Sequence, residues 1–421
     1  MRKPGQIERL YLDFDCFFAT VAQQVTPSLR GRPVGIVPFA GTGHTCIIAC
    51  SREAKLSGVK NVMSVSEALA LCRDLILVPQ TPDLYRRAHN ALVSEISAVL
   101  PVDAIKSIDE ITCRVAPVDR ADPLVLGRRI KKRIAEQIGS FITCSIGFGA
   151  NRQLAKIACK ASKKAGERYG NGNLAWHPRD MPAPLLALEL EDIPGIGRRM
   201  KERLAQRGIG SMSQLLATQP KQMRKLWGNV TGERLWYALH GYDVQAPPAQ
   251  RGMYGHGRVL PPDHRSIEHA HQASRLLLVK AARRMRRDEY RAGALWFWLS
   301  LKESGWSAGR GLAEIWDDHA ALMALEELWR EARRDLPPRT RIVQLGVTLG
   351  SLTSAHVRQL DFFADDDQAR QRWEAITESI DGLNRKHGRT LVSLGPWMPP
   401  PGGYAGGKIS YTRIPRIEDF W

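Results

Sequence analysis

The sequence lacks any apolar run that approaches the roughly 20 residues required by a membrane-spanning helix. It also lacks an early basic segment followed by an apolar one, which is the arrangement of a secretory signal peptide. These two absences predict a cytoplasmic protein that has no membrane partner. A monomer is the expected state.

Cysteine is scarce, and its pattern excludes the two usual structural roles of this residue. The seven cysteines are an odd number, and all of them lie in the first 160 residues. No two of them form a C-x-x-C pair, and no second cysteine pair completes a zinc site around Cys46 and Cys50. We therefore expect reduced thiols, with neither disulfide bonds nor structural zinc.

Acidic residues are too few to balance the basic ones. The chain of 421 residues has 61 lysines and arginines against 43 aspartates and glutamates, which gives a formal charge of +18. Such an excess favours a polyanionic partner such as nucleic acid through counterion release, although a merely solvated basic surface has the same composition. The length allows about two to four domains.

Two short acidic stretches stand beside or within segments that should be buried strands. Residues 13–18 (Asp-Phe-Asp-Cys-Phe-Phe) follow the apolar residues 10–12, and residues 107–110 (Ser-Ile-Asp-Glu) lie inside the apolar-rich run 105–115. Burying a charge is costly, so carboxylates persist in such places when a cation lies between them. Carboxylate oxygens shared with phosphates suit one or two Mg²⁺ ions, which indicates phosphoryl or nucleotidyl transfer. The alternative is a hairpin turn with two solvated acids.

The first part of the chain predicts a mixed α/β domain, because strand and helix patterns alternate along it. The expected strands are 7–14, 33–37, 45–49, 105–115 and 142–148. The expected helices are 17–24, 52–73 in two pieces, 82–100, 123–138 and 151–164.

The remainder of the chain predicts two further regions. Residues 182–239 carry only helical signals, and Pro247-Pro248 marks a linker. A second α/β domain should follow, with a short helix after it and then a Pro/Gly-rich end. The expected elements are helices 266–287 and 319–333, strands 294–301 and 342–349, and the short helix around 367–386.

Five stretches, in a fixed order, give the chain a resemblance to a known family. They are residues 13–19, 27–34, 107–110, 147–158 and 193–197. In sequence and order these stretches resemble the Y-family DNA polymerases, the translesion class, and they span roughly residues 8–205. The third domain is similar to the family only in its position and its helix-strand pattern.

The resemblance implies an α+β multidomain fold with the right-hand architecture of a polymerase. This architecture has a palm, fingers and a helical thumb, with an additional α/β little-finger domain. The implied boundaries are palm 1–16 and 81–174, fingers 17–80, thumb 175–243, linker 244–252, little finger 253–355 and a C-terminal tail 356–421.

The same resemblance implies a metal site. Asp13, Asp109 and Glu110 match the metal-binding and catalytic carboxylates of the family, and the carbonyl of Phe14 matches its main-chain ligand. The implied cofactor is a pair of Mg²⁺ ions, which would activate the primer 3′-hydroxyl and neutralise the triphosphate.

For the nucleotide, the resemblance implies five residues. They are Phe17, Phe18, Arg52, Lys55 and Lys163. Phe18 matches the steric gate against a ribose 2′-hydroxyl, whereas Phe17 is as readily a core anchor. Arg52 and Lys55 stand where the family has Tyr and Arg. Both replacements are cationic, but the hydroxyl of the Tyr and the bidentate guanidinium of the Arg are lost. Lys163 matches a triphosphate contact, and the alternative is a solvated lysine.

Two macromolecular contacts are also implied. Gly195 and Gly197, followed by Arg198 and Arg199, resemble a helix-hairpin-helix that binds a DNA phosphate, although a helical turn without a ligand is possible. The segment 359–363 resembles a peptide that docks on the bacterial sliding clamp, although it could be a strand edge. Its candidate contacts are Gln359, Leu360, Phe362 and Phe363. The basic run 283–287 has two possible interpretations, a solvated helix face or a surface that binds duplex DNA.

We therefore expect a template-directed DNA polymerase of the translesion type. It would bind primer–template DNA and deoxynucleoside triphosphates, with low fidelity and no proofreading as the resemblance implies. One alternative is a polymerase-like scaffold that binds DNA and clamp with little or no catalysis. The other is an ordinary helix-hairpin-helix DNA-binding protein, which would leave Asp13, Asp109 and Glu110 without a role.

Overall fold

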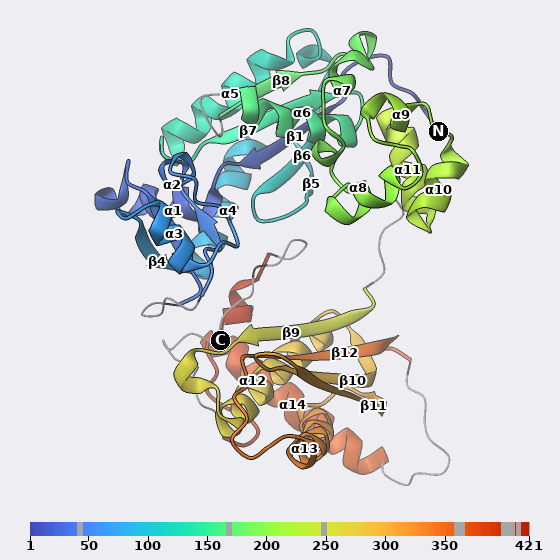
Figure 1. The fold of residues 1–421 in the computed structure, drawn as a ribbon. Helices are drawn as coiled ribbons and strands as arrows, with labels where there is room; N and C mark the ends of the chain where they lie inside the picture. Colours follow the sequence, from blue (N-terminus) through green and yellow to red (C-terminus); the bar gives the residue numbers. More distant parts are fainter. Residues whose placement is uncertain are drawn as a thin grey trace. The chain divides into compact units, whose positions relative to one another are not determined.

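The computed structural model divides into two compact units, and each is described by itself (Figure 1). The first unit comprises Met1–Pro247 and Ile409–Ile414, and the second comprises Pro248–Lys408 and Pro415–Trp421. The structure describes residues 1–39, 45–165, 171–245, 251–357, 367–396, 409 and 414–420.

A five-stranded sheet forms the centre of the first unit, in the order β5-β6-β1-β7-β8. β1 is its middle strand and runs antiparallel to both neighbours, while β8 is parallel to β7. The strands are β1 (Arg9–Phe14), β5 (Val102–Ile105), β6 (Glu110–Arg114), β7 (Cys144–Gly149) and β8 (Asn173–Ala175). The expected single strand 105–115 is therefore wrong, because a hairpin between β5 and β6 contains the acidic pair.

Helices cover both faces of this sheet, and side chains alternate along β1 to meet them. The helices are α4 (Pro82–Ser97), α5 (Pro123–Gln137) and α6 (Arg152–Ala165). Leu10, Leu12 and Phe14 belong to the core shared with α4 and α5, whereas Tyr11 packs with residues of α6. The period of two along a strand therefore directs Asp13 toward α6, on the same face as Tyr11.

A glycine lets α6 approach the sheet closely. A Cβ atom at Gly147 in β7 would lie 2.0 Å from the backbone nitrogen of Cys159 in α6. Any larger residue at this position would push the helix away from the sheet. This close packing places the basic end of α6 beside the end of β1.

The segment expected to form the fingers is a small three-stranded sheet with helices. β2 (Val34–Val37) lies between β3 (Ala49–Cys50) and β4 (Ile76–Pro79). The helices are α1 (Phe17–Val25), α2 (Arg52–Leu56) and α3 (Val65–Leu71). The prediction of a helix in two pieces across 52–73 is confirmed, and side chains of Ser51 and Ser64 cap the two pieces.

Between residues 182 and 239 every element is helical, as expected. The α-helices are α7 (Ala183–Leu186), α8 (Arg198–Ala205), α9 (Met212–Leu216), α10 (Pro220–Trp227) and α11 (Val230–Leu239). Short 3₁₀ turns across the chain are Pro27–Leu29, Pro117–Asp119, Pro178–Asp180, Leu190–Asp192, Pro262–His264 and Ile417–Phe420.

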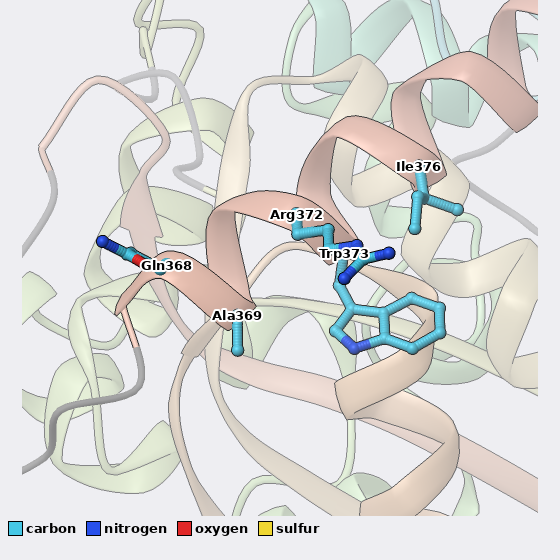
Figure 2. A pocket seen from close by; sticks show the side chains of 5 residues that line it. All are labelled: Gln368, Ala369, Arg372, Trp373 and Ile376. Atoms are coloured by element: carbon cyan, nitrogen blue, oxygen red, sulfur yellow. The ribbon is translucent and has the colours of Figure 1, made fainter.

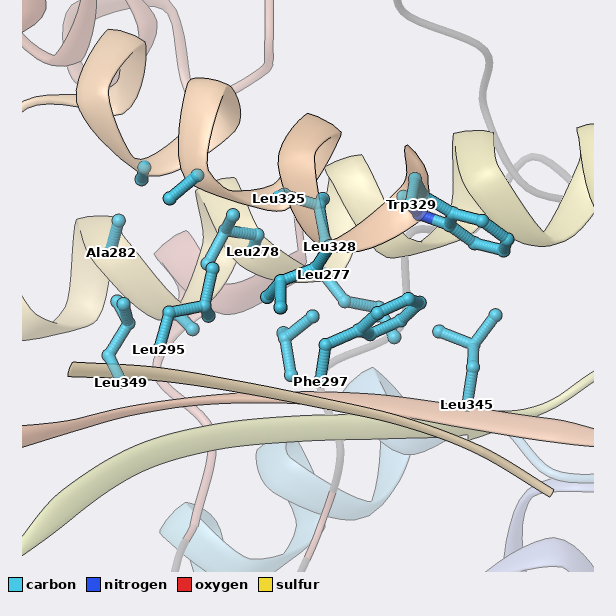
Figure 3. Packing of buried hydrophobic residues seen from close by; sticks show 14 of the residues in the cluster. Leu277, Leu278, Ala282, Leu295, Phe297, Leu325, Leu328, Trp329, Leu345 and Leu349 are labelled. Atoms are coloured by element: carbon cyan, nitrogen blue, oxygen red, sulfur yellow. The ribbon is translucent and has the colours of Figure 1, made fainter. Parts of the chain in front are cut away.

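The second unit is a four-stranded antiparallel sheet with helices on one face. Its order is β11-β10-β12-β9. The strands are β9 (Met253–Val259), β10 (Tyr290–Ser300), β11 (Gly305–Ile315) and β12 (Gln344–Ser354), and the helices are α12 (Ile267–Arg287) and α13 (Asp318–Asp335). Figure 3 shows Leu295, Phe297 and Leu345 of the sheet beneath Leu278 and Trp329 of the helices. Both β9 and β11 were missed in the sequence because glycines interrupt their apolar pattern.

Helix α14 (Asp367–His387) belongs to the second unit, contrary to the tail expected for residues 356–421. Arg286 of α12 is buried and pairs with Asp318 of α13 at 2.7 Å and with Asp381 of α14 at 2.8 Å. Arg283 also reaches Asp381, at 3.1 Å. The basic run 283–287 was interpreted as either a solvated face or a DNA-binding one. Both interpretations were incomplete, because several of its arginines form ion pairs within the second unit.

No helix among the described residues is long and apolar enough to cross a membrane.

Candidate active site

The three carboxylates expected to bind metal lie at one end of the first sheet. Asp13 is the register partner of Glu110 in the antiparallel pair of β1 and β6. The amide of Phe14 donates to the carbonyl of Asp109 at 2.8 Å, which joins the β5–β6 hairpin to the end of β1. A hairpin, and not one long strand, therefore brings the acidic pair beside Asp13.

Asp13 forms an ion pair with Lys163 of α6. The Nζ atom of Lys163 lies 2.5 Å from Oδ1 of Asp13, whose side chain is 21% exposed. Burial raises the pKa of Asp13 to about 7; Lys163 opposes this shift, and the negative charge of Asp109 adds to it. Burial lowers the pKa of Lys163, but the charge and hydrogen bond of Asp13, together with the charge of Asp15, raise it further, so the net shift is upward. Lys163 is thus paired with Asp13 and is not a fully solvated lysine.

The other two carboxylates have partners of their own. The Nζ atom of Lys156 lies 2.8 Å from Oε1 of Glu110, and it also donates to the hydroxyl of Tyr11 at 3.0 Å. The hydroxyl of Ser107 donates to the carboxylate of Asp109. Two ammonium groups and one hydroxyl therefore face the three acids.

The acidic hairpin is supported from α4. Nδ1 of His89 lies 2.7 Å from the carbonyl oxygen of Ile108. Because a carbonyl only accepts, Nδ1 carries the hydrogen of this bond. Burial lowers the pKa of His89, which keeps the imidazole neutral in this position. His89 thereby holds the residue next to Asp109.

The donor set fits Mg²⁺ in its chemistry, since carboxylate oxygens and a main-chain carbonyl are the hard ligands that this ion prefers. Within the described part of the chain, no group of three or more acidic, cysteine or histidine side chains is arranged to hold a metal ion. The residues that would hold the ions are those predicted from the sequence: Asp13, Asp109 and Glu110, with the carbonyl of Phe14. Burial is the main cause of the raised pKa of Asp13, and the negative charge of Asp109 adds to it.

The two phenylalanines at the start of α1 differ in their surroundings. Phe17 is 4% exposed and belongs to the apolar core, so its side chain is a core anchor. Phe18 is partly buried, and its ring stacks on that of Tyr85 with centroids 4.2 Å apart. The ring of Phe18 is therefore held in a fixed plane beside the acidic end of β1.

Arg52 and Lys55 lie on α2. Arg52 is the first residue of the helix, and its guanidinium donates to the hydroxyl of Thr143 at 3.2 Å. Lys55 follows one turn later and is half-buried. The residue that replaces the expected Tyr thus makes a bond to the residue immediately before β7.

Asp15 is a buried acid near Lys163 that the sequence analysis left without a role. It is 2% exposed, and its carboxylate accepts from Ser145 at 2.8 Å, from Thr143 at 3.1 Å and from the amide of Asn171 at 2.7 Å. The available signal was its spacing, because residues two apart on a strand face the same side, and Asp15 follows Asp13 by two.

The predicted helix-hairpin-helix residues lie at the start of α8. Gly195 has a φ of +102°, which favours glycine, and Gly197 is the N-cap of the helix. Arg198 and Arg199 occupy its first turn and are exposed. Residues 197–200 and Arg203 line a shallow depression of about 480 Å³.

The candidate clamp contacts Gln359, Leu360, Phe362 and Phe363 lie outside the described residues. Just after them in the sequence, one side of α14 borders a depression of about 550 Å³, which Figure 2 shows with Arg372 and Trp373 on one turn and Ile376 on the next. The ring of Trp373 stacks on that of His319 with centroids 3.9 Å apart. This depression involves none of the predicted site residues.

Three family models match the chain. The impB/mucB/samB family matches residues 12–160, a thumb domain described for DNA polymerase iota matches residues 191–243, and the C-terminal domain of the impB/mucB/samB family matches residues 251–362.

Similar whole proteins agree with these matches. A DNA polymerase IV from Moorella thermoacetica is 30% identical over 412 residues, which cover 95% of this chain and 98% of that protein. A DNA polymerase IV from Oceanobacillus iheyensis is 27% identical over 392 residues, covering 91% of this chain and 90% of that protein. A solved Y-family DNA polymerase chimera has a similar fold, with a TM-score of 0.67 at 22% identity over 82% of this chain and 99% of that one.

This chain belongs to the Y family of DNA-directed DNA polymerases. The α+β multidomain, right-hand fold predicted from the sequence is confirmed, including the helical thumb and the C-terminal little-finger sheet.

Proposed function

We propose that this protein is a translesion DNA polymerase that adds a deoxynucleotide to a primer 3′-hydroxyl by a two-Mg²⁺ mechanism, releasing pyrophosphate. The observation that carries the proposal is the gathering of Asp13, Asp109 and Glu110 at one end of the sheet, next to the ammonium group of Lys163. When bound, the ions would supply Lewis acidity for the hydroxyl and charge neutralisation for the phosphates.

The residues of the chain would bind and orient the triphosphate. Lys163 lies beside Asp13, so it can turn from the carboxylate to a phosphate oxygen as substrate and metal enter. Lys156 keeps Glu110 oriented from the same helix. Both contacts replace solvent with fixed charges, which is how a polymerase site stabilises developing charge.

The same proposal includes the nucleotide and DNA contacts that the sequence predicts. Phe18 would exclude the 2′-hydroxyl of a ribonucleotide, and its ring already has a fixed plane through its stacking on Tyr85. Arg198 and Arg199, with the amides near Gly195 and Gly197, would bind a DNA phosphate at the start of α8. Low fidelity and the absence of proofreading are part of the same proposal. Three expectations stay predictions: that the protein is a monomer, that it is cytoplasmic and that it docks on the sliding clamp.

Primer extension tests the proposal against the scaffold alternative. The native chain should extend a primer on a template in the presence of Mg²⁺ and all four deoxynucleotides. Asp109→Asn should lower the rate by at least about 10³-fold while DNA affinity changes less than about twofold, because the carboxylate acts only in the chemical step. Ser107→Ala, which removes only the hydrogen bond to Asp109, is the matched control. Equal extension by the native and Asp109→Asn proteins would exclude the mechanism, and no extension by either would favour the scaffold.

A further inference from the structure

Asp15 is a buried carboxylate that collects hydrogen bonds from separate parts of the chain. Ser145 in β7 and Thr143 just before that strand donate through hydroxyls, at 2.8 and 3.1 Å, and Asn171 donates through its amide at 2.7 Å. A carboxylate has about four acceptor positions. A buried acidic group with this many donors is held in one orientation.

One of these donors extends the contact to the segment expected to form the fingers. Thr143 donates its hydroxyl hydrogen to Asp15, and the same oxygen accepts from Arg52 of α2 at 3.2 Å. A single hydroxyl therefore joins a cation on α2 to a buried anion at the end of β1. The bond uses one of the five N–H donors of the guanidinium, so the others can serve a phosphate.

The second cation near Asp15 is Lys163. Its Nζ atom lies 2.5 Å from Asp13 and 3.9 Å from Asp15. If a metal ion takes Asp13 as a ligand, the attraction of Asp15 keeps the ammonium group at the site instead of releasing it to solvent. Asp15 thus acts on both cations, directly on Lys163 and through a hydroxyl on Arg52.

We propose that Asp15 is a positioning residue for the incoming triphosphate, which it serves by holding Lys163 and, through Thr143, Arg52. The proposal rests on the function proposed above and deepens it. It also gives a role to Arg52, which stands where the family pattern has Tyr. The hydroxyl of Thr143 orients the guanidinium of Arg52, and its other N–H donors can then face the triphosphate.

The test separates the hydroxyl from the charge. Thr143→Val keeps the shape of the side chain but removes the hydroxyl. We expect its equilibrium Kd for a fluorescent deoxynucleoside triphosphate, measured on the primer–template complex in Ca²⁺, to rise about three- to tenfold. In Mg²⁺ the KM should rise by the same factor, with kcat changed less than about twofold.

Three further variants distinguish positioning from loss of structure. Thr143→Ser restores the hydroxyl and should recover the native Kd. Thr26→Val makes the same chemical change at an exposed threonine and should leave the Kd unchanged. Arg52→Met should raise the Kd, and adding Thr143→Val to it should raise the Kd no further, because the hydroxyl acts through Arg52.

Two results would overturn the inference: a native Kd in Thr143→Val, or additive effects of Thr143→Val and Arg52→Met. Asp15→Asn supplies a second measurement, since it keeps the shape and removes the charge near Lys163. Its Kd should rise at least as much as that of Thr143→Val, and a native Kd would also count against the inference. Because the binding measurement in Ca²⁺ requires no catalysis, these results stand apart from failure of the native chain to extend a primer.

Discussion

Lys163 places its ammonium group 2.5 Å from the carboxylate of Asp13, although 150 positions separate the two residues. The pair combines a strand-end acid with the last turns of α6, which the close approach at Gly147 makes possible. The contact has consequences for metal binding and for stability, and both depend on pH.

Magnesium binding should weaken as the pH falls below 7. Burial raises the pKa of Asp13 to about 7, so below that pH a proton competes with the metal, and the affinity should drop about tenfold for each further pH unit. Calorimetry in two buffers of different ionisation enthalpy measures the proton released on binding. Release should approach one proton near pH 6 and vanish near pH 8.5, and Asp13→Asn should abolish the difference. Equal release at both pH values in the native protein would contradict the raised pKa.

Lys163→Met should destabilise the metal-free protein more at high pH than at low pH. The folded-state pKa of Asp13 lies above its unfolded value, so the folded state binds more protons and stability falls as the pH rises from about 4 to 7. Without Lys163, the carboxylate of Asp13 is charged and unpaired at pH 8, which lowers the free energy of unfolding by about 1–3 kcal/mol. Near pH 5 Asp13 is protonated, so the loss of stability is smaller. Urea unfolding at the two pH values measures this. Lys132→Met, at a lysine that is 74% exposed, is the control. Equal losses at both pH values would refute the explanation.

Phe18→Ala should relax sugar discrimination. Its ring is fixed by stacking on Tyr85, and removing it opens space for a 2′-hydroxyl, so the preference for deoxynucleotides should fall by roughly 10- to 100-fold. Single-nucleotide insertion kinetics with matched ribo- and deoxynucleotides measure the ratio. Tyr85→Phe keeps a ring beneath Phe18 and serves as the control. An unchanged ratio in Phe18→Ala would rule out the steric gate.

Asp381→Ala should destabilise the second unit. It removes the carboxylate that pairs with both Arg286 and Arg283 and leaves Asp318 as the other partner of Arg286. Breaking a buried ion pair by removing one partner costs about 3–5 kcal/mol. Calorimetric melting of the full chain should show a lower transition for that unit. Glu378→Ala, at an exposed acid of the same helix, should change little. A native melting profile for Asp381→Ala would show that α14 is dispensable.

Replacing Phe362 and Phe363 with Ala should abolish capture by the bacterial sliding clamp, because aromatic anchors dominate such interfaces. Primer extension without clamp should persist at a rate within about twofold of the native rate, because the change leaves the active-site residues in place. The measurement is a pull-down with purified clamp. Val357→Ala, just before the segment and exposed, is the control. Capture of the double variant at the native level would disprove the assignment.

The sequence alone was sufficient for the class of enzyme, and it singled out the acids that stay the predicted metal ligands. Asp13 follows the apolar residues 10–12 of an expected strand, and Asp109 and Glu110 lie in a second apolar-rich run. The order of the motifs then indicated the family. Strongly periodic segments such as 17–24 and 151–164 were correctly predicted as helices, because local pattern determines them.

Only the tertiary structure decided which charges meet. The sequence presented residues 283–287 as one basic surface, yet Arg286 is buried against Asp318 and Asp381 from two other helices. Likewise, Arg52, Thr143 and Asp15 are scattered along the chain, and no local pattern connects them. Contacts of this kind depend on how strands and helices stack, so their energies come from burial and from partners distant in sequence. The strand pattern determined the acids, and the packing of α6 and α2 determined the cations that face them.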